Sequence, residues 1–270
     1  MGTLLHTNRN QSMFMYSDRG VGGQHVLLTP RVTGTTLIKY GLLYNFFVTT
    51  DSRELTSSSE WRVPTETDWD TLFNSLDSFE APAWPTLGAK LRSVGNTYWV
   101  DQLIYDEGTE DEFIDLGIPG TDEYSFNIRG AGVRSFLDGQ FYGKNEYTQL
   151  MSTSIDTHTG VSPLDHHYEV FTSFNLPSMT RSNFYNYGGT SIRLIKDFTS
   201  LSDGETGQYI GNDGKIYDTI CIGTQEWVSR NLAETKYRNG DSIPEITNDI
   251  EWLATSEGAL CAYNNDWNFV

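Results

Sequence analysis

Three histidines and two aspartates lie within one short stretch of the chain: Asp156, His158, Asp165, His166 and His167. Imidazole and carboxylate groups are common ligands of transition metals, so this group is a candidate metal site. Its spacing follows no regular ligand motif, and adjacent histidines on a strand would point to opposite faces. The alternative is that these are exposed loop residues, which is the interpretation we prefer, and we expect no bound metal.

The sequence contains no recognisable catalytic motif. No G-x-S-x-G segment marks a nucleophilic serine, and neither a P-loop nor a dinucleotide-binding fingerprint is present. The two cysteines, Cys221 and Cys261, have no neighbouring histidine and make a poor zinc site. We expect them to be reduced and buried, with a single disulfide left open as the alternative. We therefore predict no catalytic residues and no enzymatic activity.

Oxygen ligands are abundant between residues 101 and 123, which hold nine acidic residues and no lysine or arginine. Acidic, glycine-containing loops can bind Ca²⁺. The alternating D-x-D-x-D-G pattern of such loops is absent, so a solvated loop is the preferred interpretation. Ca²⁺ is the only cofactor that the sequence suggests, and we otherwise expect none.

The stretch most suggestive of ligand binding runs from Asp165 to Gly189 and is rich in Tyr, Phe, Asn, Ser and Arg. Rigid aromatic side chains with small polar neighbours are typical of recognition surfaces. The alternative is that Phe171, Phe174 and Phe184 belong to the core and the rest is loop. The residues that we predict to contact a ligand are Tyr168, Arg181, Asn183, Tyr185, Asn186 and Tyr187.

These candidate residues depend on a scaffold of short elements. Thr65 is a good helix N-cap with Asp68 placed to reach back to it, and the apolar residues of 69–76 repeat at helical intervals. A second short helix is expected within 40–48. Alternating segments at 126–128, 141–143, 150–154, 168–171 and 192–195 predict an antiparallel sheet. Residues 198–208 have the composition of a linker.

The charge balance restricts the partners. The formal net charge of −18 argues against nucleic acid, because phosphates would be repelled. No apolar run approaches the ~20 residues of a membrane span, so no membrane insertion is expected. The first residues lack the basic and apolar regions of a Sec signal peptide, which predicts that the chain is made in a cytoplasm and is not exported by that route.

Several short motifs occur along the chain, among them Tyr40-Gly41-Leu42-Leu43-Tyr44, Trp61-Arg62-Val63-Pro64-Thr65 and the segment from Gly214 to Trp227. Together these motifs resemble the Fibrobacter succinogenes major paralogous domain, a module of Bacteroidetes proteins and their phages. That module is similar to C-type lectins in fold and related to the formylglycine-generating enzymes. Its middle and closing landmarks match segments 40–44, 61–65, 68–69, 88–93, 151–154 and 191–197. Its opening landmarks match 214–227, 231–232, 240–244, 252 and 262–266. The cysteine that precedes the Trp-His-Leu-Pro segment of many members is absent here.

The landmarks stand in a shifted order, with the opening half last. The resemblance therefore implies an α+β, C-type-lectin-like domain with antiparallel sheets and one or two short helices, apparently circularly permuted. Its expected parts are an extended N-terminal arm (1–36), the main part of the module (37–197), a linker (198–211) and the opening strands (212–270). These opening strands would pack on 37–197 of the same chain or, alternatively, of a neighbouring chain.

The resemblance and the missing catalytic motifs lead to one functional expectation. The chain would be a bacteriophage virion protein, a fibre, tail or capsid appendage, that binds a host-surface glycan or protein. Residues 1–36 would dock on other virion proteins, and a homotrimer is expected. The alternatives are a purely structural decoration protein without a ligand and a secreted adhesin on a bacterial cell surface.

Overall fold

The computed structural model describes residues 38–105, 113–155 and 165–270. The described residues belong to one compact unit, in which the segments before 197 and after 212 pack together within a single chain. The expected N-terminal arm, the centre of the acidic loop (106–112), Asp156 and His158 lie outside the described residues.

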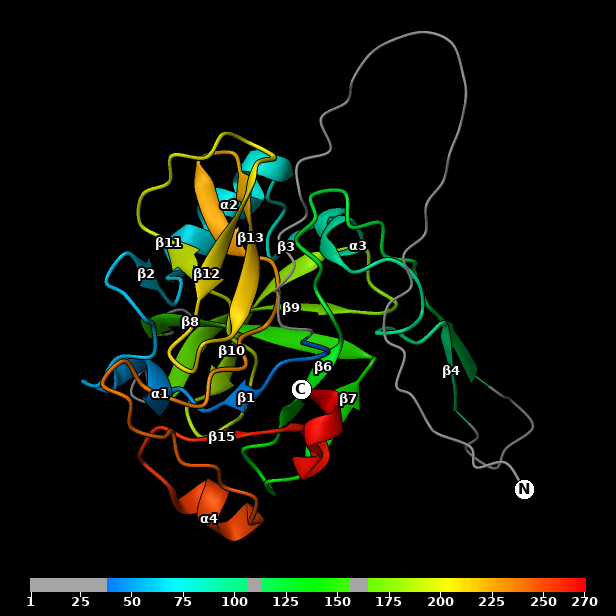
Figure 1. The fold of residues 1–270 in the computed structure, drawn as a ribbon. Coiled ribbons are helices and arrows are strands. Elements are labelled where there is room, and N and C mark those ends of the chain that lie inside the picture. The colour runs from blue at the N-terminus through cyan, green and yellow to red at the C-terminus, as the bar shows by residue number, and fades with distance from the viewer. Residues whose placement is uncertain (1–37, 106–112, 156–164) are drawn as a thin grey trace, which may run out of the picture. The chain divides into compact units, whose positions relative to one another are not determined.

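The described part of the chain is a β-rich α+β protein (Figure 1). Its helices are short and more numerous than the one or two expected: α1 (Phe47–Thr50), α2 (Glu66–Leu76), α3 (Leu87–Leu91), α4 (Asp249–Ala254) and the 3-10 helices η1 (Tyr263–Asn265) and η2 (Trp267–Phe269). Its strands in chain order are β1 (Leu43–Tyr44), β2 (Trp61–Arg62), β3 (Ala83–Trp84), β4 (Gln102–Tyr105), β5 (Phe113–Leu116), β6 (Ala131–Arg134), β7 (Phe141–Lys144), β8 (Tyr147–Ile155), β9 (His166–Ser173), β10 (Met179–Tyr185), β11 (Ile195–Lys196), β12 (Thr206–Ile210), β13 (Ile216–Ile222), β14 (Gln225–Val228) and β15 (Leu260–Cys261).

One five-stranded sheet joins the two halves of the chain, in the order β12-β13-β14-β11-β2. Strand β11 lies between β14 and β2, with Ile195 opposite Trp227 in an antiparallel register. The 191–197 segment thus lies beside the 214–227 region, although the ladder includes only β11. The expectation that 198–211 is a linker is wrong in part, because these residues include β12, which pairs with β13.

A six-stranded sheet has the order β3-β10-β9-β8-β6-β7. Its pairs are antiparallel except for β6 and β8, which meet in parallel at Gly132 and Thr148. Strand β4 pairs with β5 in a separate hairpin. The strand expected at 126–128 is not formed. Asn127 has a left-handed φ of 57°, and only Ile128 makes an isolated bridge, to Arg92.

The stretch 40–48 was expected to be helical but contains a strand followed by a helical turn. Leu43 in β1 pairs with Cys261 in β15, and α1 begins only at Phe47. Figure 1 shows the blue β1 beside the red β15, which brings the first described residues to the end of the chain. The Tyr40 amide donates to the Phe269 carbonyl at 3.0 Å, so these two ends lie side by side.

Helix α2 forms as its sequence predicts. The Thr65 hydroxyl accepts from the Asp68 amide, and the Asp68 carboxylate accepts from the Thr65 amide, which satisfies two otherwise unpaired donors at the helix start. Trp69, Leu72 and Phe73 are buried on one face. The Trp69 ring packs against Trp227 with centroids 4.6 Å apart, so the helix is held by a strand from the other half of the chain.

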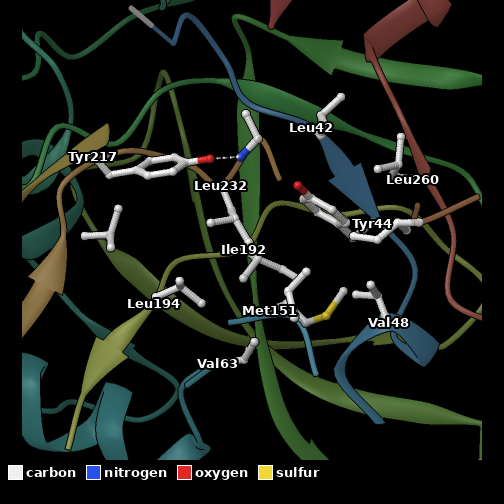
Figure 2. Packing of buried hydrophobic residues seen from close by; sticks show 14 of the residues in the cluster. Leu42, Tyr44, Val48, Val63, Met151, Ile192, Leu194, Tyr217, Leu232 and Leu260 are labelled. Atoms are coloured by element: carbon white, nitrogen blue, oxygen red, sulfur yellow. Dashed lines mark hydrogen bonds between the residues drawn. The ribbon is translucent and has the colours of Figure 1, made fainter. Parts of the chain in front are cut away.

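The main hydrophobic cluster also draws on both halves (Figure 2). In this view Ile192 lies between Leu232 and Met151, with Leu194 to one side, and all four side chains are completely buried. The Ala233 amide donates to the Tyr217 hydroxyl at 3.0 Å, which satisfies a polar group inside this apolar environment. Neither half could bury these residues without the other.

Three arginines are completely buried: Arg92, Arg134 and Arg193. Their guanidinium groups donate mainly to main-chain carbonyls of irregular segments, such as Leu176 and Ile118 for Arg92. Burial lowers the pKa of Arg193 to about 9 and that of Arg92 to about 10. These side chains satisfy the carbonyl groups of loops that no sheet partner reaches.

Candidate functional site

The predicted ligand-binding stretch is an antiparallel hairpin of β9 and β10, rather than a loop. Asn183 lies opposite Tyr168 and Tyr185 lies opposite His166. Since side chains alternate along a strand, Arg181, Asn183 and Tyr185 share one face of the sheet. Tyr187 follows after the end of β10.

Tyr185 is clamped between two aromatic rings at the end of β10. Its ring centroid lies 3.7 Å from that of His166 and 4.0 Å from that of Phe136. Tyr187 meets the ring of Phe47 edge-on at 5.3 Å. Tyr185 and Tyr187 are only partly buried. We call Phe47, Phe136, His166, Tyr185 and Tyr187 the aromatic face. His166 is buried and supports Tyr185 from beneath, whereas the other four rings are partly exposed. The rings of this face are held in place before any ligand arrives.

For two of the six residues predicted to contact a ligand, the prediction was wrong. Tyr168 is 3% exposed and Asn186 is 4% exposed, so neither side chain can touch a ligand on the surface of this structure. The sequence pattern did not separate them from their exposed neighbours, because burial depends on α2 and on the segment around Phe46 packing over this sheet. Both residues support the surface from beneath.

A buried polar network supports the turn that carries Tyr185 and Tyr187. Asn186 Oδ1 lies 3.0 Å from His167 Nδ1, and His167 Nε2 lies 2.8 Å from Glu169 Oε1. The Thr190 hydroxyl donates to the same glutamate oxygen at 2.6 Å. His167, Glu169 and Thr190 are completely buried, and the Phe46 ring stacks on His167 at 4.8 Å.

Arg181 lies farther back along β10 and is bound to α2. It donates to Asp70 Oδ2 at 2.6 Å, and its guanidinium lies 4.5 Å from the centre of the Phe79 ring. Burial and then the nearby Asp70 carboxylate raise the pKa of Tyr168, which faces the same group. Arg181 therefore serves mainly to join the helix to the sheet. Of the six predicted residues, Tyr168 and Arg181 lie at this junction, Tyr185 and Tyr187 belong to the aromatic face, and Asn186 lies beneath that face. Asn183 is a partly buried residue of β10 opposite Tyr168.

The two described histidines of the candidate metal cluster do not lie in an exposed loop, which was the preferred interpretation. His166 and His167 lie on β9 and are buried, 4% and 0% exposed. Among residues 38–105, 113–155 and 165–270, no three His, Cys, Asp or Glu side chains come together as a metal site would require. Cys221 and Cys261 are free and buried, as expected, and burial raises the pKa of Cys261 to about 12.

Sequence reasoning missed Phe47, Phe136 and His166 as parts of the aromatic face. Phe47 precedes Tyr187 by 140 positions, so no local periodicity connects them. His166 was identified only as a candidate metal ligand. The sequence offered one signal for His166: it lies two positions before Tyr168 in an alternating segment, so the two side chains share one face of the strand.

No protein-family model matches the chain, and neither a curated protein nor a solved structure matches it. In the part of the chain that the structure describes, no helix combines the length and apolar character that crossing a membrane requires. The fold and the site together define a β-rich α+β protein with a partly exposed, preorganised aromatic surface.

Proposed function

We propose that this chain is a non-enzymatic binding protein of a bacteriophage particle, which attaches to a glycan or protein on the host surface. The observation that supports this most directly is the clamping of Tyr185 between His166 and Phe136. Partly exposed rings that are already ordered lose little conformational entropy on binding, and they offer a flat apolar area to a sugar face or a side chain.

The architecture that we propose is a circularly permuted, C-type-lectin-like module. Its support is the contact between landmarks that are far apart in the chain. Ile195 pairs with Trp227, and the Asn231 side chain donates to the Tyr40 carbonyl at 2.9 Å. Joining 191–197 to 212–227 through the β12 hairpin moves the free ends of the module to the neighbourhood of Tyr40 and Phe269.

Within a particle, residues 1–36 would dock on other virion proteins, and the appendage would be a homotrimer. Deletion of residues 1–36 should abolish incorporation into particles and leave the melting temperature of the remaining chain unchanged. Normal incorporation of the shortened chain would count against docking through this segment.

Attachment itself is tested by Tyr185→Ala and Tyr187→Ala, alone and together, with binding of the purified protein to intact host cells as the readout. Tyr142→Ala is the matched control, because Tyr142 is an exposed tyrosine on β7, at 47% exposure. Binding should fall for the aromatic-face variants and persist for the control. Unchanged binding by the double variant would reject the aromatic face, and no binding by any form would favour a structural decoration protein.

A further inference from the structure

A cleft of about 370 Å³ opens beside the start of α2. Segment 49–65 forms most of its wall, and Thr153 of β8 and Arg238 of the C-terminal half complete it. Its volume lies within the range of roughly 300–1,000 Å³ that small-molecule sites occupy. None of the five aromatic-face residues lines it.

Hydroxyl groups dominate the polar lining: those of Thr49, Thr56, Ser59, Thr65 and Thr153. Several already donate to main-chain carbonyls, as Thr56 does to the Trp61 carbonyl at 2.8 Å. The hydroxyls of Thr56 and Thr65 also accept, from Arg238 Nη2 and the Asp68 amide. Those of Thr49 and Thr153 donate to the Phe46 and Pro64 carbonyls, so their oxygens keep a lone pair and act as oriented acceptors. Leu55, Trp61 and Val63 supply an apolar part of the wall.

The charged groups of the lining are paired with one another or with close neighbours. Arg238 forms an ion pair with Glu54 and donates to the Thr56 carbonyl at 2.7 Å. Arg62 binds Asp68 with two nitrogens and Asp197 with its Nε. The two arginines balance Asp51 and Glu54, so the lining has no formal net charge. A site of this kind favours neither an anion nor a cation.

The cleft is also rigid and locally strained. The Trp61 ring packs against Tyr209 with centroids 5.1 Å apart, and the Arg53 guanidinium donates to both oxygens of Asp51, at 2.9 and 2.6 Å. Glu54 has a left-handed φ of 57°, which is unfavourable for a residue with a side chain. Such strain persists where the surroundings hold it, often at ligand sites.

We propose that this cleft binds a neutral, polyhydroxylated ligand, namely one saccharide unit. Fixed hydroxyl acceptors and the remaining N–H groups of paired arginines suit the alternating donors and acceptors of sugar hydroxyls. The apolar wall suits the C–H face of a sugar ring, and the balanced charge excludes selection for uronic acids or amino sugars. The inference does not rest on the aromatic face, which would be a separate site.

The test is saturation-transfer NMR of the full chain with glucose, galactose, mannose and N-acetylglucosamine, and with glucuronate and glucosamine as charged probes. Ser59→Trp fills the cleft from an exposed loop position, and Ser52→Trp is the matched control on an exposed residue of the same segment that does not line the cleft. Ser59→Tyr replaces the tryptophan variant if that variant does not fold by circular dichroism.

At least one neutral sugar should bind the wild-type protein, Ser52→Trp and the Tyr185→Ala/Tyr187→Ala double variant equally. Ser59→Trp should weaken this binding by about tenfold or more, and the charged sugars should bind more weakly than the neutral ones. The proposal is overturned if no neutral sugar binds, if only a charged sugar binds, or if Ser59→Trp binds normally. If only the Tyr185→Ala/Tyr187→Ala double variant loses sugar binding, the sugar binds at the aromatic face. That result overturns the proposal for the cleft and supports attachment through the aromatic face.

Discussion

Arg193 Nε donates a 2.8 Å hydrogen bond to Asn231 Oδ1, and both side chains are buried. The Asn231 amide nitrogen in turn donates to the Tyr40 carbonyl and the Ser191 hydroxyl. The remaining nitrogens of Arg193 donate to the carbonyls of Phe126, Asn127 and Val228. This pair therefore joins the start of the described chain, the 122–127 loop, and the neighbouring strands β11 and β14, which come from the two halves of the chain.

Replacing Arg193 with methionine should strongly destabilise the protein. The variant leaves four buried acceptors without a donor, at about 1–3 kcal/mol each, and this loss is partly offset because a charge is no longer buried. We expect the free energy of unfolding in urea to fall by on the order of 3–5 kcal/mol. Lys90→Met, at a half-exposed helical position, should change it by less than ~0.5 kcal/mol. Equal effects of the two variants would show that the Arg193 contacts contribute little.

Removing the helix cap at Thr65 should lower the free energy of unfolding by less than removing Arg193. Thr65→Ala removes the acceptor for the Asp68 amide and should lower the free energy of unfolding by about 1 kcal/mol. Thr65→Ser keeps that oxygen and should stay close to the wild type. The measurement is a thermal or urea melt of both variants; an alanine variant as stable as the serine variant would contradict the capping role.

Glu234 should make stability depend on pH. It is completely buried, and burial raises its pKa from 4.5 to about 7, although the Tyr217 hydroxyl donates to it. A carboxyl group with a raised folded-state pKa holds its proton longer in the folded than in the unfolded protein. The contribution of Glu234 is therefore most favourable below pH ~4.5, declines as the pH rises to about 7 and is constant above that.

At about 1.4 kcal/mol for each pKa unit, the decline corresponds to on the order of 3 kcal/mol. Urea unfolding between pH 5 and 8 should show this loss in the wild type. Glu234→Gln, which resembles the protonated acid, should flatten the profile, whereas Glu257→Gln at an exposed position should not. A profile that is as steep in Glu234→Gln as in the wild type would assign the pH dependence to other groups, such as Asp122, whose pKa burial raises to about 6.

Thr190→Val tests the network beneath the aromatic face. The substitution keeps the shape of the side chain but removes the donor to Glu169 Oε1. The other carboxylate oxygen, Glu169 Oε2, has no hydrogen-bond partner in the structure. We expect a loss of about 1–3 kcal/mol in the free energy of unfolding. Thr71→Val, on the exposed face of α2, should have little effect. A neutral result for Thr190→Val would indicate that Glu169 is satisfied in another way.

Features set by neighbouring residues could be predicted from the sequence. Thr65 and Asp68 lie three positions apart, so their reciprocal hydrogen bonds follow from local geometry, and Trp69, Leu72 and Phe73 follow the helical period. The sequence also led to the expectation that 212–270 would pack on 37–197; the structure pairs Ile195 with Trp227, a register that the sequence did not predict.

The tertiary structure decided what contacts over long sequence distances control. Leu43 forms part of a strand because Cys261 lies beside it. His167 and Arg193 are polar residues that composition would place at the surface. Each can be buried because its hydrogen bonds are satisfied in the folded protein. The partners come from separate segments, which meet only when the chain folds. The same reason explains why the aromatic face and the cleft at Arg238 could not be predicted from spacing alone.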